Sequence, residues 1–268
     1  MVQRVFSRLI EVLRLAMPGH VVGAIFDVGA RDCEESRQFA IAFPRADIYA
    51  FECNPATLPA CRAVAAAEPR VRLVEKAVSN RAGRISFFPI DQQRTRTGVA
   101  NGNPGASSLL EATGNYPEER YVQNKIEVDA IRLDDFMLEH GVGSIDILWM
   151  DVQGAESMVL EGLGERIGDL RCLHMEVEFF EIYRGQLLFA DIDAYLRSRG
   201  FRLLGFTSYS RFAADALYLR ADIPVDRRAL DRACPYLSRN LRKMRWHRLK
   251  RNLRRLCGLP PWPAAAGP

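Results

Sequence analysis

The sequence IFDVGARDC occupies residues 25–33 and joins an apolar strand pattern to a turn of small residues and then to a helical pattern. In a doubly wound parallel sheet, the turn after the first strand is where a nucleotide-like ligand binds. Gly29 and Ala30 would allow the backbone to approach such a ligand closely. Dinucleotide sites use three glycines here, whereas this turn has one, together with Asp27, which would repel a diphosphate but suits an ammonium group. A purely structural turn is the alternative interpretation.

On both sides of this turn, from Val21 onward, short apolar runs alternate with helical patterns, which is typical of βαβ units and a parallel sheet. After Gly200, two apolar runs at 201–207 and 216–220 predict a closing antiparallel hairpin. The fold class is therefore α/β with a mostly parallel sheet. We expect strands near 24–28, 47–51, 71–75, 84–88, 126–131, 145–150 and 172–177, and helices near 34–43, 56–67, 133–140, 155–162 and 191–199.

Three segments are predicted along the chain. Residues 1–20 have the apolar periodicity of an amphipathic helix, and residues 21–220 contain the α/β pattern. Residues 221–268 form a basic helical tail that ends in a Pro-rich stretch, predicted to be disordered. The tail has 12 Lys or Arg and 3 Asp, a local charge of +9, so the rest of the chain sums to −5. Any affinity for nucleic acid or anionic lipid is therefore expected from the tail.

Composition places the chain among ordinary soluble proteins, with 268 residues of which 48% are apolar and 26% charged. No window has the roughly 18 uninterrupted apolar residues of a membrane span, and the N-terminus lacks a signal-peptide pattern, so a cytoplasmic location is expected. The six cysteines show no metal-binding spacing, which predicts free thiols and no metal site.

Two further carboxylates follow predicted strands. Glu52 ends the strand 47–51, about twenty residues after the first turn, where a carboxylate would meet the hydroxyls of a ribose. Asp151 follows the strand 145–150 and could hold a substrate, position a ligand, accept a proton or coordinate a cation. The alternatives are a solvated strand-end glutamate and an aspartate that caps the next helix.

The segment 89–124 is rich in Gly, Asn, Thr and Ser and is too long for an ordinary connection in a compact domain. Long loops of this kind are often lids over a binding site. We therefore expect it to cover an acceptor pocket. Tyr183 and Arg184, after the strand 172–177, are expected either to line that pocket or to belong to the ordinary surface.

The motifs IFDVGA, AFECNP, KAVSN, GASSLL, IRLDDF and ILWMDVQGAESMVLEG occur in the order found in the FkbM family of methyltransferases, which the chain resembles over residues 21–220. The resemblance implies a Rossmann-like class I methyltransferase fold and methyl transfer from S-adenosylmethionine to an oxygen, often a hydroxyl of a sugar or natural product. It implies these positions for the cofactor: Asp27, Gly29 and Ala30 in the turn, Glu52 at the ribose, and Ala77 and Val78 near the adenine.

Two departures from the family pattern concern the same site. Cys33 stands where the family usually has a second glycine, and Trp149 stands where a lysine often precedes the motif-IV acid Asp151. Methyl transfer to a hydroxyl needs a place for its proton, for which Asp151 is the first candidate and Glu176 the second. His174 is interpreted as a core residue of its strand.

Several functions remain open from the sequence. A methyltransferase acting on a small-molecule or glycan acceptor is favoured. A nicotinamide-dependent oxidoreductase is disfavoured because the chain lacks the glycines that such an enzyme has in this turn. A nucleic-acid methyltransferase is suggested only by the basic tail. A non-catalytic Rossmann-like binding protein is the remaining alternative. For the tail, contact with an anionic membrane surface competes with packing against the acidic body. The oligomeric state is not indicated by the sequence.

Overall fold

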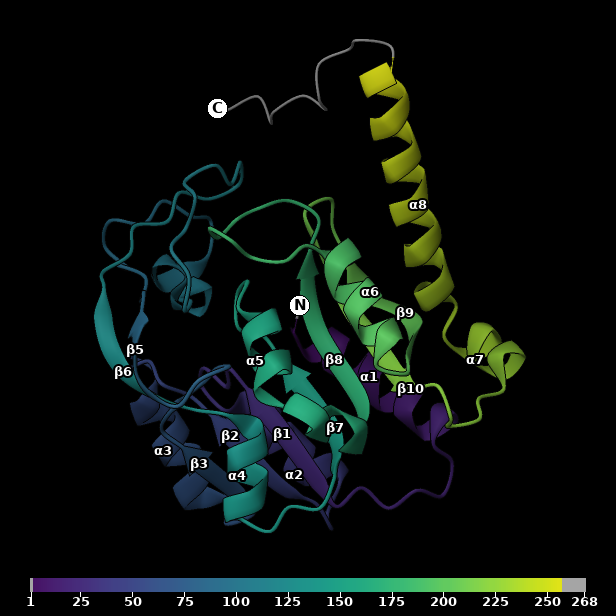
Figure 1. Cartoon of the computed structure of the whole chain (residues 1–268), viewed down its shortest axis with the longest axis horizontal. Coiled ribbons are helices and arrows are strands. Elements are labelled where there is room, and N and C mark those ends of the chain that lie inside the picture. The colour runs from purple at the N-terminus through teal and green to yellow at the C-terminus, as the bar shows by residue number, and fades with distance from the viewer. Residues whose placement is uncertain (1, 257–268) are drawn as a thin grey trace.

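The structure is a computed structural model that describes residues 2–256, and its centre is a seven-stranded sheet (Figure 1). The strand order is β3-β2-β1-β7-β8-β10-β9. The first five strands in this order are parallel to one another, and β10 is antiparallel to both its neighbours. This is the mostly parallel sheet with a closing hairpin that the sequence predicts. The strands are β1 (Ala24–Val28), β2 (Asp47–Phe51), β3 (Val71–Val74), β7 (Ile145–Met150), β8 (Leu170–Glu178), β9 (Phe201–Tyr209) and β10 (Ala213–Arg220).

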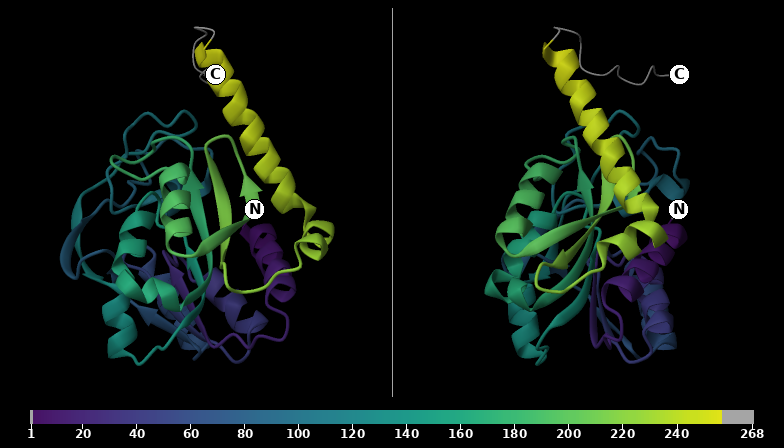
Figure 2. Two further views of the ribbon diagram at one scale, coloured as in Figure 1. Left: turned by 45° about the vertical axis from the view of Figure 1, so that its right-hand side comes forward. Right: turned by 90° about the vertical axis from the view of Figure 1, so that its right-hand side faces the viewer.

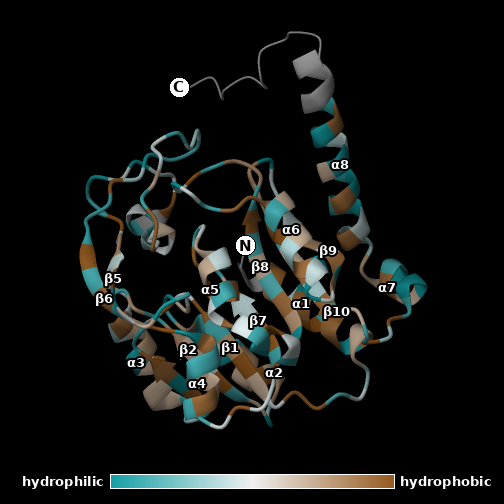
Figure 3. Cartoon of the chain, viewed as in Figure 1, coloured by the Kyte–Doolittle hydropathy of each residue, from teal (hydrophilic) through white to brown (hydrophobic). Residues whose placement is uncertain are grey.

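Helices cover both faces of the sheet, whose strands are largely hydrophobic (Figure 3). They bury the apolar side chains that point to either face. One face packs on α4, α5 and α6 through side chains such as Phe136, Leu160 and Leu196. The other packs on α1, α2, α3 and the first turn of α8 through Leu9, Phe39 and others. The helices are α1 (Val2–Ala16), α2 (Glu34–Ala42), α3 (Leu58–Ala67), α4 (Leu133–Glu139), α5 (Glu156–Gly162), α6 (Phe189–Ser198), α7 (Arg227–Ala233) and α8 (Pro235–Leu256), with 3₁₀ turns η1 (Ala100–Gly102), η2 (Pro104–Ala106) and η3 (Gly164–Asp169).

The helix predicted at the N-terminus is part of this core. Phe6 of α1 contacts Phe39 of α2 and Trp149 of β7, with ring centroids 4.8 and 6.2 Å apart. Leu9 and Leu13 are also buried on the same face of α1. The amphipathic pattern therefore marks a helix whose apolar stripe completes one layer of the protein.

A second, three-stranded sheet stands beside the carboxyl end of the main sheet. It consists of β4 (Ala77–Val78), β6 (Ile126–Ile131) and β5 (Gly83–Phe87), in the order β4-β6-β5. The strands expected at 84–88 and 126–131 are confirmed within a residue, but the sequence pattern does not reveal that they leave the main sheet. Periodicity marks a strand and not its partner, because pairing depends on tertiary packing.

The segment between β5 and β6 is held in place by isolated bridges. Phe88 pairs with Ser108, Ile90 with Gln123, and Ala112 with Tyr183. Ser108 Oγ also donates to the backbone oxygen of Gln153, at 2.7 Å. The segment therefore lies over the carboxyl ends of the main strands, and its movement as a lid remains a prediction.

The tail begins as part of the body and then leaves it. Asn240 Nδ2 donates to the backbone oxygen of Phe206, at 2.9 Å, and a Cβ on Gly205 would lie 2.6 Å from the Leu237 side chain. Further along α8, Leu241 and Met244 still pack against the core and His247 Nδ1 lies 2.7 Å from the Tyr209 hydroxyl, while the far end of the helix projects away from the sheet (Figure 2). The Pro-rich end predicted to be disordered lies in 257–268, outside the described residues.

Candidate functional site

The turn after β1 is built around a glycine that no other residue can replace without movement. Gly29 has φ +82°, and a Cβ there would lie 2.1 Å from the backbone oxygen of Asp151. The N–H groups of Gly29 and Ala30 both donate to the backbone oxygen of Phe51, at 3.0 Å. Gly29 lines a cavity, whereas Ala30 is buried beneath the turn. The turn thus brings β1, β2 and β7 together at their carboxyl ends.

The departure at Cys33 has a visible backbone consequence. Cys33 precedes α2 with φ 56° and ψ 22°, in the left-handed region that glycine favours. A residue with a Cβ pays about 1–2 kcal/mol for this conformation. The thiol of Cys33 is fully buried. Within residues 2–256 the cysteines are free, as the sequence predicts.

Asp27 lies below the turn and not in a cavity wall. Its side chain is 1% exposed, Ser36 Oγ donates to Oδ2, and the other oxygen, Oδ1, has no hydrogen-bond partner. Burial, and then the charge of Glu35, raise the pKa of Asp27 to about 8. An unpartnered buried carboxylate oxygen is costly, so this position suits a nearby cation.

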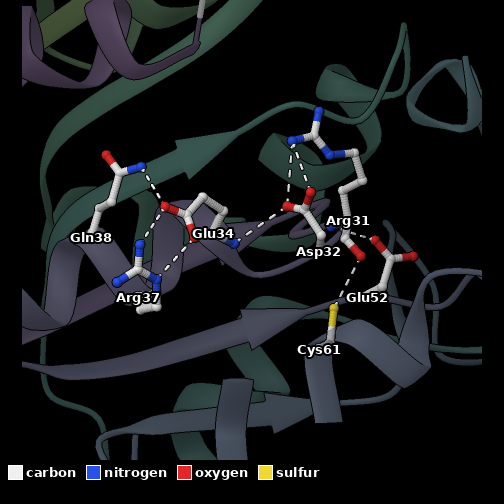
Figure 4. A network of polar contacts seen from close by, with 7 residues as sticks. All are labelled: Arg31, Asp32, Glu34, Arg37, Gln38, Glu52 and Cys61. Carbon is white, nitrogen blue, oxygen red and sulfur yellow. Dashed lines mark hydrogen bonds and ion pairs between the residues drawn. The ribbon is translucent and has the colours of Figure 1, made fainter. Parts of the chain in front are cut away.

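Glu52 follows β2, lines the cavity, and its carboxylate lies against Arg31 of the turn after β1 (Figure 4). Its carboxylate accepts the N–H of Arg31 at 2.7 Å, of Cys53 at 2.8 Å and of Asn54 at 2.6 Å. Burial raises the pKa of Glu52, and these backbone hydrogen bonds oppose the rise. The carboxylate therefore fixes the turn after β1 to the end of β2.

The first cavity lies between these two turns and the small second sheet, with a volume of about 60 Å³. Ala77, Val78 and Phe87 provide an apolar wall, and Glu52, Asn54 and Asp151 provide polar atoms. The structure thus brings four of the six predicted cofactor residues, Gly29, Glu52, Ala77 and Val78, to one cavity, and leaves Asp27 and Ala30 directly behind it.

A second cavity of about 290 Å³ adjoins the first. Both are lined by Gly29, Arg31, Gly105 and Asp151, so they meet at the carboxyl end of β7. Glu176, the second candidate base, lines the second cavity. Its other walls include side chains that the sequence analysis did not single out, namely Glu35, Tyr116, Ser208, Ser210 and Asp215.

Asp151 stands where the two cavities join. Its backbone N–H donates to the oxygen of Val28, at 3.0 Å, and its carboxylate accepts from Gln153 Nε2, at 2.6 Å. Desolvation raises the pKa of Asp151, while the Gln153 hydrogen bond and the charge of Arg31 oppose the rise. The residue that precedes α5 is Ala155, and no side chain caps that helix, so the capping interpretation of Asp151 is wrong.

The remaining candidates divide clearly. His174 is buried, stacks on Trp149 at 4.3 Å and bonds Thr207, and burial lowers its pKa to about 3, as expected of a core residue. Tyr183 is fully buried and lines neither cavity, so both expectations for it, a pocket-lining residue and an ordinary surface residue, are wrong. Arg184 is paired with Glu111 instead, at 3.9 Å.

Metal clusters and membrane spans are two other features that a sequence of this kind could contain. In the part of the chain that the structure covers, no three His, Cys, Asp or Glu side chains are grouped to hold a metal ion. Among the same residues, no helix is both long and apolar enough to cross a membrane.

Comparison with known proteins agrees with this geometry. Residues 27–203 match the model of the methyltransferase FkbM domain. The 2-O-methyltransferase NoeI of Sinorhizobium fredii is 36% identical over 165 residues, 61% of this chain and just under two thirds, 66%, of NoeI. The 31-O-demethyl-FK506 methyltransferase FkbM of Streptomyces tacrolimicus is 27% identical over 203 residues, 70% of this chain and 74% of that protein.

Among solved structures, an rRNA methylase from Streptococcus thermophilus aligns with a TM-score of 0.43 and 9% identity, over 80% of this chain and 93% of that one. The family match spans most of the main sheet, both turns that line the first cavity, and Asp151. The chain therefore belongs to the FkbM family of S-adenosylmethionine-dependent methyltransferases.

Proposed function

We propose that this protein transfers the methyl group of S-adenosylmethionine to a hydroxyl oxygen of a sugar, glycan or natural-product acceptor. The observation that supports the proposal most directly is the junction of the two cavities at Asp151, which gives the donor and the acceptor adjoining sites. The names of both relatives, a 2-O-methyltransferase and a 31-O-demethyl-FK506 methyltransferase, agree with an oxygen acceptor.

The first cavity, together with the turn beside it, fits the donor on three grounds. Asp27 Oδ1 is buried without a partner, which suits the ammonium group of the methionine part. The apolar wall at Ala77 and Val78 suits a purine, and the Glu52 carboxylate in the cavity wall suits ribose hydroxyls. Gly29 and Ala30 would hold the backbone close to the ligand. These six residues form the cofactor site in our proposal.

When bound, S-adenosylmethionine supplies a methyl group on a positively charged sulfur, which a nucleophile can take up while the sulfur leaves as a neutral thioether. The protein has to align the acceptor oxygen with that methyl group and take up the hydroxyl proton. In our proposal Asp151, at the cavity junction, accepts the proton or orients the hydroxyl. Glu176, held 2.9 Å from the same Gln153 amide, is the second candidate.

Two measurements test the proposal. Thermal shift with S-adenosylhomocysteine should raise the melting temperature of the protein, and NAD should not. A panel of glycans and natural products, incubated with donor labelled on its methyl group, should show label on one acceptor class. Label on RNA or DNA instead would favour the nucleic-acid alternative and contradict the proposal.

Glu52→Ala should weaken S-adenosylhomocysteine binding by about 10- to 100-fold, because a hydrogen bond to a charged group contributes about 1.5–3 kcal/mol. Calorimetric titration measures the loss. Glu75→Gln is the matched control, since Glu75 is also a glutamate after a strand but pairs with Arg62 on the surface. If wild type and Glu52→Ala bind S-adenosylhomocysteine with equal affinity, Glu52 is not part of the cofactor site.

For the chain as a whole, we propose the three segments 1–20, 21–220 and 221–268, with the last serving as a membrane contact. The proposal is supported by α8, where Trp246 is 55% exposed and Leu249 is 49% exposed beside Arg242, Lys243 and other basic residues. Apolar side chains among basic ones fit an anionic lipid surface. The enzyme is then a cytoplasmic protein that reaches the membrane through its tail.

A double change, Trp246→Ala with Leu249→Ala, should reduce binding to phosphatidylglycerol-containing vesicles by at least about tenfold, because both side chains would lose apolar burial. Co-sedimentation measures binding, with pure phosphatidylcholine vesicles as the uncharged comparison. Leu138→Ala, at an exposed leucine of α4, is the control variant. Binding of the protein to tRNA but not to vesicles would contradict the membrane contact.

A further inference from the structure

Gln153 occupies an unusual position between the two candidate bases. Its amide nitrogen Nε2 lies 2.6 Å from Asp151 Oδ1 and 2.9 Å from Glu176 Oε2. A carboxylate only accepts hydrogen bonds, whereas an amide NH₂ has two hydrogens to donate. One side chain therefore satisfies an oxygen of each carboxylate and separates two groups that would otherwise repel each other.

The opposite end of the amide is fixed as well. Gln153 Oε1 lies 3.0 Å from the hydroxyl of Tyr183, a fully buried residue whose hydroxyl is also 2.8 Å from the backbone oxygen of Ala106. With both carboxyl groups ionised, a reversed amide would face them with its oxygen, an arrangement without any donor. The two carboxylates thus select one orientation of the amide, and the Tyr183 hydroxyl supports it with a single hydrogen that is shared between Gln153 Oε1 and the backbone oxygen of Ala106.

The backbone supports the same arrangement. Gln153 has φ 55°, a left-handed conformation that side chains other than glycine rarely adopt. Its backbone oxygen accepts from Ser108 Oγ, at 2.7 Å, so the segment between β5 and β6 contacts Gln153 directly and also through Ala106 and Tyr183. A strained residue held by several neighbours is often found at functional sites.

We propose that Gln153 is a positioning residue of the methyl-transfer reaction, which holds Asp151 and Glu176 in place and favours the ionised form of Asp151, and that Tyr183 fixes the Gln153 amide for this purpose. The inference rests on the proposed function only in that Asp151 or Glu176 serves the acceptor hydroxyl. It assigns a role to Tyr183 although that side chain reaches neither cavity.

The direction of the pH effect follows from the hydrogen bonds. Donation by Gln153 lowers the pKa of Asp151, against the rise caused by desolvation, so loss of the donor raises that pKa. A base acts only when it is ionised, and the acid limb of the pH–rate profile should therefore move to higher pH. The charged and titratable groups that act on Asp151 or share its cluster are Arg31 and Glu35 near the first turn, Asp27 of β1, Glu156 of α5, Glu176 and Glu178 of β8, Asp215 of β10, and Tyr183.

The first test needs no acceptor. In protein labelled with ¹³C at the aspartate carboxyl carbons, the Asp151 signal is assigned by its loss in Asp151→Asn, and its ionisation is followed by NMR. In Gln153→Leu the midpoint should rise by about one pH unit, and in Tyr183→Phe it should rise by less. An unchanged midpoint in Gln153→Leu would overturn the proposal.

Tyr218→Phe is the matched control for the tyrosine. Tyr218 is equally buried, and its hydroxyl donates to a carboxylate, Asp193 Oδ1, at 3.1 Å, on another part of the sheet. Its removal should lower stability without moving the Asp151 midpoint. A midpoint that moved equally in Tyr218→Phe and Tyr183→Phe would show a general structural effect and overturn the role of Tyr183.

Once an acceptor is known, turnover against pH gives the second test. Gln153→Leu and Tyr183→Phe should both move the acid limb upward, while S-adenosylhomocysteine affinity stays within about twofold. If wild type methylates no acceptor, the proposed function fails and the NMR result still stands. If wild type is active and both variants keep its pH profile, the positioning role fails alone.

Discussion

Asp151→Asn should lower turnover by about 10²- to 10⁴-fold, the usual contribution of general acid–base assistance. The substitution keeps the size of the side chain and an oxygen that can accept from Gln153, so the cavity junction should remain intact. The affinity for S-adenosylhomocysteine should therefore change by less than about threefold. Initial rates at saturating donor and acceptor, together with calorimetric titration, separate the two effects.

Asp129→Asn serves as the control, because Asp129 is an exposed aspartate of β6 that pairs with Arg84. Melting temperatures of both variants should stay close to that of wild type. Added magnesium or EDTA should leave the turnover of wild type unchanged if Asp151 acts on the hydroxyl proton. Near-normal turnover of Asp151→Asn would instead make Asp151 structural and move the assignment to Glu176.

Gly29→Ala should destabilise the protein by about 2–5 kcal/mol, through left-handed strain together with overpacking. The new Cβ would lie 2.1 Å from the backbone oxygen of Asp151 and 3.0 Å from its carbonyl carbon, so β1 and β7 would have to move apart at the cavity. Binding of S-adenosylhomocysteine should weaken as well. Urea unfolding measures the first effect and calorimetry the second.

Gly141→Ala separates strain from overpacking. Gly141 also has a positive φ, +64°, but a Cβ added there would meet no atom within 4 Å, so only the cost of about 1–2 kcal/mol for the left-handed backbone applies. Equal destabilisation by the two substitutions would mean that the turn at Gly29 relaxes freely, and the close approach of β1 and β7 would then have no energetic role.

The sequence predicts the main sheet well because each strand has a local signal. The boundaries of β1 and β2 agree with the expected ranges, and Glu52 and Asp151 follow their strands at the edge where parallel sheets place ligands. The sequence analysis missed Asp215 because nothing in the residues around it indicates that a charged side chain within this antiparallel strand lines the cavity. Only the pairing of β10 with β8 places Asp215 opposite Glu176.

Tyr183 shows a different limit of sequence reasoning. Its position after β8 suggested a pocket residue, yet its ring is fully buried and its hydroxyl reaches the segment between β5 and β6. That contact joins residues 77 positions apart. Local periodicity contains no information about such a pair, whereas the strand and the turn that precede it are local features.

The uneven charge of the two cavities has a kinetic consequence. Five carboxylates line them, those of Glu35, Glu52, Asp151, Glu176 and Asp215, against two basic side chains, Arg31 and Lys76. Burial raises the pKa of all five carboxyl groups, so this negative field strengthens as pH rises and they ionise. The field speeds the approach of a cation and slows that of an anion, with an effect that fades as ionic strength rises. The donor arrives with a sulfonium charge that its thioether product no longer has. The same carboxylates that speed binding of the donor therefore do little to slow dissociation of the product.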